Sequence, residues 1–220
     1  MILAAQEQAL TTRKTFSVLY PDIDPQCRLC RDAPETAAHL LPHCSVLLKQ
    51  QQYTTRHNRV CNIIHWNILK KNNITSSQKY WEHKANEFET NGEVDVFYDK
   101  LIRLGEYVNN KALRPDIIVH NKRTREAQII EIGITSDIGI ATTTHRKTVK
   151  YADFKNILKR EWGLLKVDLI PVVMGVTGLY QNSLHRELAR IWAPVDVDQL
   201  QSAVVREGVT ILKRALSLNM

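Results

Sequence analysis

Hydrophobic and polar positions alternate in a way that predicts several strands in the second half of the chain. Short β-rich runs occupy 94–98, 116–120 and 127–134, and the polar turn 121–126 between the last two is typical of a β-hairpin. A longer apolar run at 169–176 predicts a buried strand. These strands indicate a sheet, with helices between some of its strands in the sequence.

Apolar side chains also recur at helical spacing in four segments, near 60–68 and over 143–162, 182–192 and 198–216. The polar segment 67–91, which is rich in Asn, Ser and Lys, is expected to be largely a loop. The alternation of strands and helices predicts an α/β fold with a central mixed sheet flanked by helices.

The composition, 44% apolar and 24% charged, excludes collagen-like and disordered classes. The longest apolar run contains a proline and falls well short of the roughly 18–20 residues that cross a bilayer. The first residues also lack the basic and apolar regions of a secretory signal. We therefore expect an intracellular protein with no membrane-spanning helix.

The positive charge is distributed unevenly. Residues 1–50 contain five basic and five acidic side chains, so the whole excess of +7 lies in residues 51–220. We therefore divide the chain into an N-terminal segment, 1–50, and a basic domain, 51–220. A basic domain of this kind suits a surface that binds phosphates, although charge alone also fits a soluble protein with no such partner.

Three of the four cysteines fall in the pattern Cys27-x2-Cys30-x8-His39-x4-Cys44, which predicts a zinc site. His43 could replace Cys44 as the fourth ligand, but we favour Cys44 because adjacent residues rarely point at one metal. The site has no open position, so we expect structural zinc. The alternative is that the cysteines are reduced and the histidines stand there by chance.

Asp116 and Glu131 lie on the two strands of the predicted hairpin. Two carboxylates on adjacent strands can share a hard divalent cation, and Glu131 has isoleucines on both sides, so it needs a partner. The competing interpretation is that Asp116 caps a turn after Pro115 and Glu131 points to solvent.

A lysine would complete a nuclease site, but Gly133 occupies the usual position, two residues after the second acid. On the predicted helix 143–162, Lys147 lies near the centre of the apolar stripe and Lys150 lies to one side of it. Lys147 is therefore the first candidate, unless it only extends its amine to solvent from the first turn.

An ordered set of motifs resembles the C-terminal part of polyproteins of site-specific non-LTR retrotransposons that carry a restriction-like endonuclease. The resemblance covers about 4–218, and its value lies in the combination, since no single piece is specific. The motifs are Cys-x2-Cys-x8-His-x4-Cys, Arg56-His57-Asn58, Arg114-Pro115-Asp116, Glu131, Lys147-x2-Lys150-Tyr151 and Ile170-Pro171-Val172-Val173.

The resemblance implies a PD-(D/E)XK restriction-endonuclease-like core preceded by a CCHC zinc knuckle. It further implies a DNA endonuclease, dependent on magnesium or manganese, that nicks target DNA for target-primed reverse transcription. Asp116 and Glu131 would hold that metal, Lys147 or Lys150 would be the catalytic lysine, and Tyr151 would lie near the site. Glu131 replaces the aspartate that is more frequent at this position.

The expected partners follow from the same resemblance. Arg56 and His57, with Arg59 and Arg114 as further basic candidates, would bind nucleic acid, and the knuckle would contact DNA or element RNA. A reverse transcriptase domain would be a partner, because the sequence has no recognisable polymerase motif and is expected to be a fragment or a separated reading frame. Nuclear localisation is expected, without a small-molecule cofactor. The alternative function is a non-catalytic, zinc-dependent nucleic-acid-binding module.

Overall fold

A five-stranded mixed sheet forms the centre of the chain. The computed structural model describes residues 3–4, 9–75, 77–104 and 113–216. The strands lie in the order β1-β2-β3-β4-β5, the first four antiparallel and the last two parallel. Their bounds are β1 (Phe88–Thr90), β2 (Val94–Tyr98), β3 (Ile117–Asn121), β4 (Glu126–Thr135) and β5 (Lys166–Gly175). The predicted hairpin is therefore confirmed as β3 and β4.

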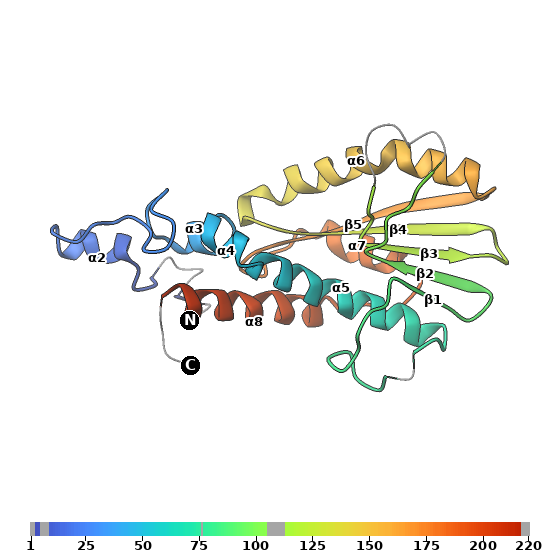
Figure 1. Cartoon of the computed structure of the whole chain (residues 1–220), viewed down its shortest axis with the longest axis horizontal. Coiled ribbons are helices and arrows are strands. Elements are labelled where there is room, and N and C mark those ends of the chain that lie inside the picture. Colours follow the sequence, from blue (N-terminus) through green and yellow to red (C-terminus); the bar gives the residue numbers. More distant parts are fainter. Residues whose placement is uncertain (1–2, 5–8, 76, 105–112, 217–220) are drawn as a thin grey trace.

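Helices cover both faces of this sheet. Figure 1 shows α6 along one face, with α5, α7 and α8 on the other. The helices are α2 (Arg13–Leu19), α3 (Ala37–Leu40), α4 (Ser45–Lys49), α5 (Gln52–Lys71), the 3-10 turn η2 (Asp137–Gly139), α6 (Ile140–Glu161), α7 (Ser183–Arg190) and α8 (Val197–Ala215). The mixed α/β class and the four helices expected from apolar spacing are confirmed, with boundaries shifted by a few residues.

The two faces of the sheet bury different side chains. On β3 and β4, Ile118 and Ile129 pack under α6, whereas Ile130 and Ile132 belong to the core beneath α5, α7 and α8. Because successive residues of a strand point to opposite faces, Glu131 faces α6. The helix joins the parallel strands β4 and β5, a connection that needs a long crossover.

The segment 67–91, expected to be a loop, is only partly one. Helix α5 continues into it as far as Lys71, and the short strand β1 lies near its end. β1 pairs with β2, and only Glu89 of its three residues is even half-buried. The loop prediction was wrong there because so short an edge strand shows no alternation of apolar and polar residues.

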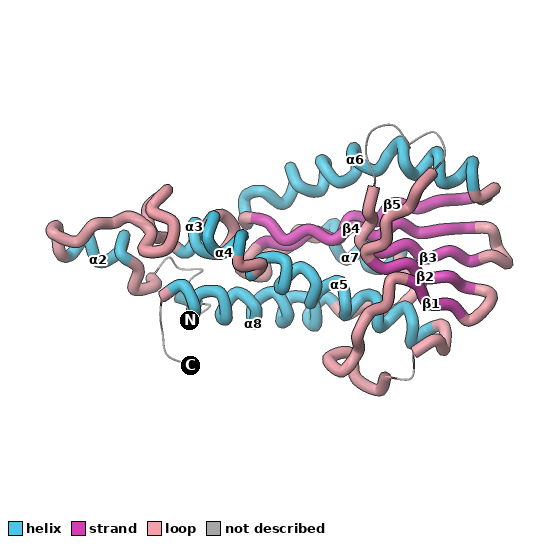
Figure 2. Tube along the Cα trace, in the orientation of Figure 1, coloured by secondary structure: helices cyan, strands magenta, loops and turns pink. Residues whose placement is uncertain are grey.

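The N-terminal segment consists of short helices joined by loops, as Figure 2 shows. Its apolar residues Leu40 and Leu47 form a cluster with Ile211 and Leu212 at the end of α8. The segment thus packs on the helices beneath the sheet, while the division at residue 50 stays a prediction. Within the described ranges, no helix combines the length and the apolar character needed to cross a bilayer.

Gly133 sets the distance between α6 and β4. A Cβ atom there would lie 3.1 Å from Thr143 Cγ2, 3.3 Å from Val173 Cγ2 and 3.4 Å from Lys147 Cε. Glycine normally weakens a strand, so its presence here is explained by the close approach of the helix. The aliphatic chain of Lys147 thus occupies space that a side chain at position 133 would fill.

We predict that Gly133→Val destabilises the protein by about 1–3 kcal/mol through overpacking, with Gly133→Ala intermediate. β-propensity alone would give the opposite order, since valine favours strands. Urea unfolding of the three proteins measures the effect. A valine variant as stable as the parent would show that α6 can move away from the sheet without cost.

Candidate functional site

Asp116 and Glu131 are cross-strand neighbours at the point where the β3–β4 ladder stops. The last backbone pair is Ile117 with Ile130, so these two acids form the next pair in register. Beyond this point, hydrogen bonds to their side chains take the place of hydrogen bonds between the two backbones. The Asp116 N–H donates to Glu131 Oε1 at 3.1 Å, and the Ile132 N–H donates to Asp116 Oδ2 at 2.7 Å. The strand ends therefore hold both carboxylates in place.

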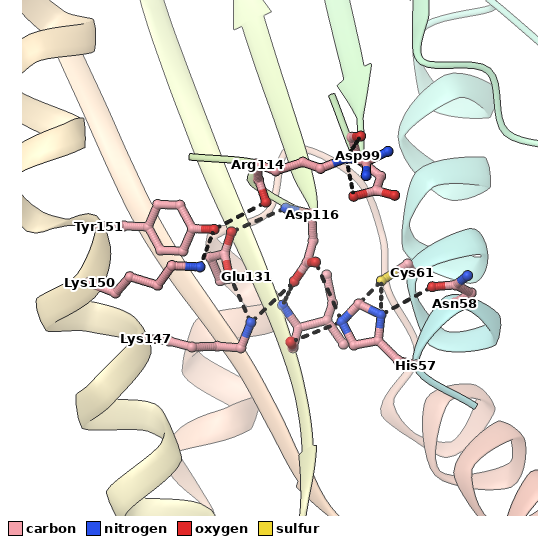
Figure 3. A network of polar contacts seen from close by, with 11 residues as sticks. His57, Asn58, Cys61, Asp99, Arg114, Asp116, Glu131, Lys147, Lys150 and Tyr151 are labelled. Carbon is pink, nitrogen blue, oxygen red and sulfur yellow. Dashed lines mark hydrogen bonds and ion pairs between the residues drawn. The ribbon is translucent and has the colours of Figure 1, made fainter. Parts of the chain in front are cut away.

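The amine of Lys147 lies between the two acids. Its Nζ donates to Glu131 Oε2 at 2.9 Å and to Asp116 Oδ2 at 3.3 Å, as Figure 3 shows. The Glu131 side chain is 1% exposed, and those of Asp116 and Lys147 are 15% and 19% exposed. One positive charge is thus shared by two largely buried carboxylates.

This environment shifts the pKa values of the two acids in opposite directions. Burial opposes ionisation of Asp116, but the hydrogen bond and charge of His57, with the charge of Lys147, lower its pKa. Burial raises the pKa of Glu131, and the negative charge of Asp116 adds to the rise. Burial disfavours the charged amine, yet Asp116 and Glu131 raise the pKa of Lys147. Asp116 is therefore the better stabilised anion of the two, and burial makes Glu131 the acid that is costly to ionise.

His57 approaches Asp116 from α5, opposite Lys147 on α6 (Figure 3). Its Nε2 lies 3.4 Å from Asp116 Oδ1 and 3.2 Å from the Ile132 carbonyl oxygen. Burial alone would lower the pKa of His57, but the Cys61 sulfur and Asp116 raise it to about 11. A pocket of about 220 Å³, which His57 and Asp116 help to line, opens beside them. Sequence reasoning assigned His57 to nucleic acid and missed this contact with the acid.

Tyr151 and Lys150 form the next layer of the site. The Tyr151 side chain is buried and its hydroxyl donates to the Arg114 carbonyl oxygen at 3.2 Å. Lys150 is exposed, and its Nζ donates to the Tyr151 hydroxyl at 3.0 Å. Burial, together with Glu131, raises the pKa of Tyr151. Between the two lysines left open by the sequence, the geometry favours Lys147 as the one that reaches the carboxylates.

The three arginines expected to bind nucleic acid lie in different environments. Arg56 is 1% exposed and donates to the Leu41 carbonyl oxygen at 3.0 Å, and burial lowers its pKa to about 10. Its guanidinium faces the protein interior, so the expectation that it contacts DNA is not supported. Arg59 and Arg114 are 44% and 54% exposed and pair with Glu207 and Asp99. Both therefore remain accessible to a ligand.

The cysteine motif forms a compact group. Cys27 Sγ lies 4.0 Å from Cys44 Sγ, Cys30 Sγ lies 3.2 Å from His39 Nε2, and all four ligand atoms are within 4.8 Å of one another. Tetrahedral zinc with Zn–S bonds of about 2.3 Å needs sulfurs about 3.8 Å apart. His43 is exposed and outside the group, which favours Cys44 as the fourth ligand. This group can bind zinc.

The loop around these ligands is held by a buried acid. Glu35 is fully buried and accepts hydrogen bonds from the Arg13 and Arg28 backbone N–H groups and from the Arg28 guanidinium. Burial, followed by the charge of His43, lowers the pKa of His39, so its imidazole is neutral, the form that binds zinc. Burial raises the pKa of Cys44 to about 11, so zinc binding must release its proton.

The comparisons with known proteins are sparse. No protein-family model matches the sequence, and no curated protein matches it. One matching solved structure is a cap-snatching endonuclease of the phenuiviridae, with 13% identity and a TM-score of 0.30. The match covers 55% of this chain and 56% of the viral one, so it spans about half the length of either. That endonuclease is a distant structural neighbour, and the function proposed below rests on the geometry of the site.

We predict that Cys44→Ala weakens metal binding to the cysteine group far more than His43→Ala does. Removing a residue that only hydrogen-bonds to a metal ligand already lowers metal affinity by about 10–100-fold. Removing a ligand itself should lower the affinity further. Cobalt titration, followed by thiolate-to-cobalt absorption, measures this site specifically. The reverse order of effects would assign His43 as the ligand.

We predict that Glu131→Gln raises the unfolding temperature by about 2–4 °C at pH 8, which corresponds to about 1 kcal/mol in a chain of this size. Because folding raises the pKa of Glu131 above its ordinary value of 4.5, its stabilising contribution is full below pH 4.5 and is lost as pH rises through the raised pKa. Glutamine is neutral at every pH and keeps an oxygen for the Asp116 N–H.

The difference between the two proteins should therefore shrink as the pH falls through the raised pKa of Glu131 and be smallest below pH 4.5. Calorimetry across pH 4–8 provides the comparison. If the variant were less stable than the parent at pH 8, the Lys147–Glu131 ion pair would be a net stabilising contact and this account of the buried acid would fail.

Proposed function

We propose that the chain is a metal-dependent DNA endonuclease domain of the PD-(D/E)XK type. The observation that carries the proposal is the placement of Asp116 directly before β3 and of Glu131 on the adjacent strand β4, with the Lys147 amine reaching both. A structural ion pair needs only one acid for one amine. Two acids converging on a partly open site are what a nuclease requires to hold a cation against a phosphodiester.

The donor atoms suit a hard divalent cation. Carboxylate oxygens of Asp116 and Glu131 would hold Mg²⁺ or Mn²⁺, since such ions prefer oxygen ligands. When bound, the ion supplies Lewis acidity that activates water and offsets negative charge on the phosphodiester. Lys147 would then direct its ammonium to the phosphate or the attacking oxygen, and His57 would keep Asp116 oriented from the α5 side.

Lysine placement is the unusual part of this proposal. In the usual arrangement the lysine lies two residues after the second acid, and here that residue is Gly133. Lys147 passes its aliphatic chain over Gly133, with Cε 3.4 Å from where a Cβ would stand, and delivers its amine to the same carboxylates. A lysine on helix α6 thus supplies the ammonium group that strand β4 lacks.

We further propose that this domain belongs to a non-LTR retrotransposon polyprotein and nicks target DNA for target-primed reverse transcription. The support is the order of the sequence motifs together with the net charge of +7, all of it outside residues 1–50. The partners would be target DNA, element RNA and the reverse transcriptase domain, and the site of action would be nuclear. The Cys3His group would hold structural zinc and contact nucleic acid.

A specific observation also favours a second candidate function. Lys147 already occupies oxygens of both acids, so the site is satisfied without a metal ion. A degenerate copy could keep this ion pair as a structural element and bind nucleic acid through the zinc group and exposed arginines alone. Such a module would bind DNA and leave it intact.

We predict that the purified chain nicks supercoiled plasmid with Mg²⁺ or Mn²⁺ and that chelation stops the reaction. Glu131→Gln, Asp116→Asn and Lys147→Met should each lower the rate by at least about 100-fold, because each removes charge stabilisation at the reacting phosphate. Lys159→Met, an exposed lysine further along α6, should nick at the parent's rate.

Gel-shift binding separates the two candidate functions. Variants that bind DNA like the parent but do not nick support the endonuclease. A parent chain that binds DNA but does not nick it with any divalent metal would support the non-catalytic module. Undiminished nicking by Glu131→Gln would place the reaction elsewhere in the chain.

A further inference from the structure

A second group of potential metal ligands lies away from the nuclease site and from the cysteine group. It consists of His65 on α5, His83 in the connection after it, and Glu89 on the edge strand β1. His65 Nδ1 lies 2.9 Å from His83 Nε2, and His65 Nε2 lies 3.7 Å from Glu89 Oε2. One ligand atom from each side chain falls within 4.8 Å of the others. Three separate segments thus converge on one point.

Burial makes this convergence costly without a further partner. The His65 side chain is fully buried and that of Glu89 is 18% exposed. His65 Nε2 and Glu89 Oε2 are both buried and have no hydrogen-bond partner. Buried polar atoms are nearly always paired, so these two atoms point to a missing ligand.

A hydrogen bond between the imidazoles accounts for only part of the arrangement. It pairs His65 Nδ1 with His83 Nε2 and leaves the other nitrogen of His65 and the oxygen of Glu89 without partners. A cation bound by one nitrogen of each histidine and one oxygen of Glu89 would engage all three side chains. Tetrahedral ligands at about 2.0–2.2 Å are about 3.4 Å apart, which small side-chain rotations can reach.

We propose that His65, His83 and Glu89 form a second transition-metal site that takes zinc. Two imidazoles and one carboxylate are a known zinc ligand set, whereas magnesium and calcium prefer oxygen ligands throughout. The Tyr98 ring, with its centroid 4.9 Å from that of His65, forms one wall of the site. The fourth position is left for water or another small ligand.

The site would stabilise segments of the fold that have little regular secondary structure of their own. β1 has only three residues, and the connection before it has no regular helix or strand among its described residues. In Figure 1 the end of α5, this connection and β1 gather at one corner of the sheet. A metal ion here would cross-link all three, as structural zinc does in small loop-rich segments.

Zinc counting on the full chain tests the proposal. The parent carries Glu131→Gln and Asp116→Asn, so that the nuclease site, including the His57, Cys61 and Asp116 group, has no carboxylate for zinc. The protein is loaded with zinc, desalted and analysed by elemental mass spectrometry. We expect two zinc ions per chain, one of them in the cysteine group. His83→Ala and Glu89→Gln should each retain one, while the control His120→Ala, a half-buried histidine near Asp95, should retain two.

Cobalt absorption from the cysteine group serves as the check on folding, because it should be the same in all these proteins. One zinc per chain in the parent, or two in both His83→Ala and Glu89→Gln, would overturn the proposal and leave a hydrogen-bonded histidine pair. Nicking by the chain without the Asp116 and Glu131 substitutions is measured separately. The two measurements therefore show separately whether the second zinc site is wrong and whether the proposed nuclease function is wrong.

Discussion

The candidate site depends on one ammonium group shared by two carboxylates. Asp116 lies directly before β3, Glu131 lies on β4 and Lys147 lies on α6, and their contacts join these elements. Each charge would be costly to bury alone, and His57, whose pKa is raised to about 11, adds a second positive group beside Asp116. Burial, followed by the charge of Asp116, still raises the pKa of Glu131. For a cation to bind to both acids, the Lys147 amine must leave the oxygens that it occupies.

Helix α5 connects this site to the zinc-binding segment. Its consecutive residues Arg56 and His57 face different parts of the molecule, the first bonding to the Leu41 carbonyl and the second approaching Asp116. A displacement of the N-terminal segment would therefore act on the same helix that orients the acid. The candidate site and the cysteine group are thus joined through one helix, even though the sequence separates them by composition and charge.

The sequence predicted the parts of this structure that depend on local periodicity. The hairpin that carries Asp116 and Glu131, and the inward position of Lys147 on its helix, follow from strand and helix periods. The sequence did not predict the burial of Arg56, because its partner carbonyl comes from a separate segment that only tertiary packing brings close. His65 was missed for a related reason, since its neighbours His83 and Glu89 lie in a stretch whose polar composition indicated only a loop.

The most direct test is anomalous diffraction from crystals soaked in Mn²⁺. The account predicts a manganese peak at coordination distance, about 2.1 Å, from oxygens of both Asp116 and Glu131, with the Lys147 amine moved out of its bridging position. A map with no peak there, and with Lys147 still bonded to both acids at saturating Mn²⁺, would contradict it. The three side chains would then be a structural ion pair.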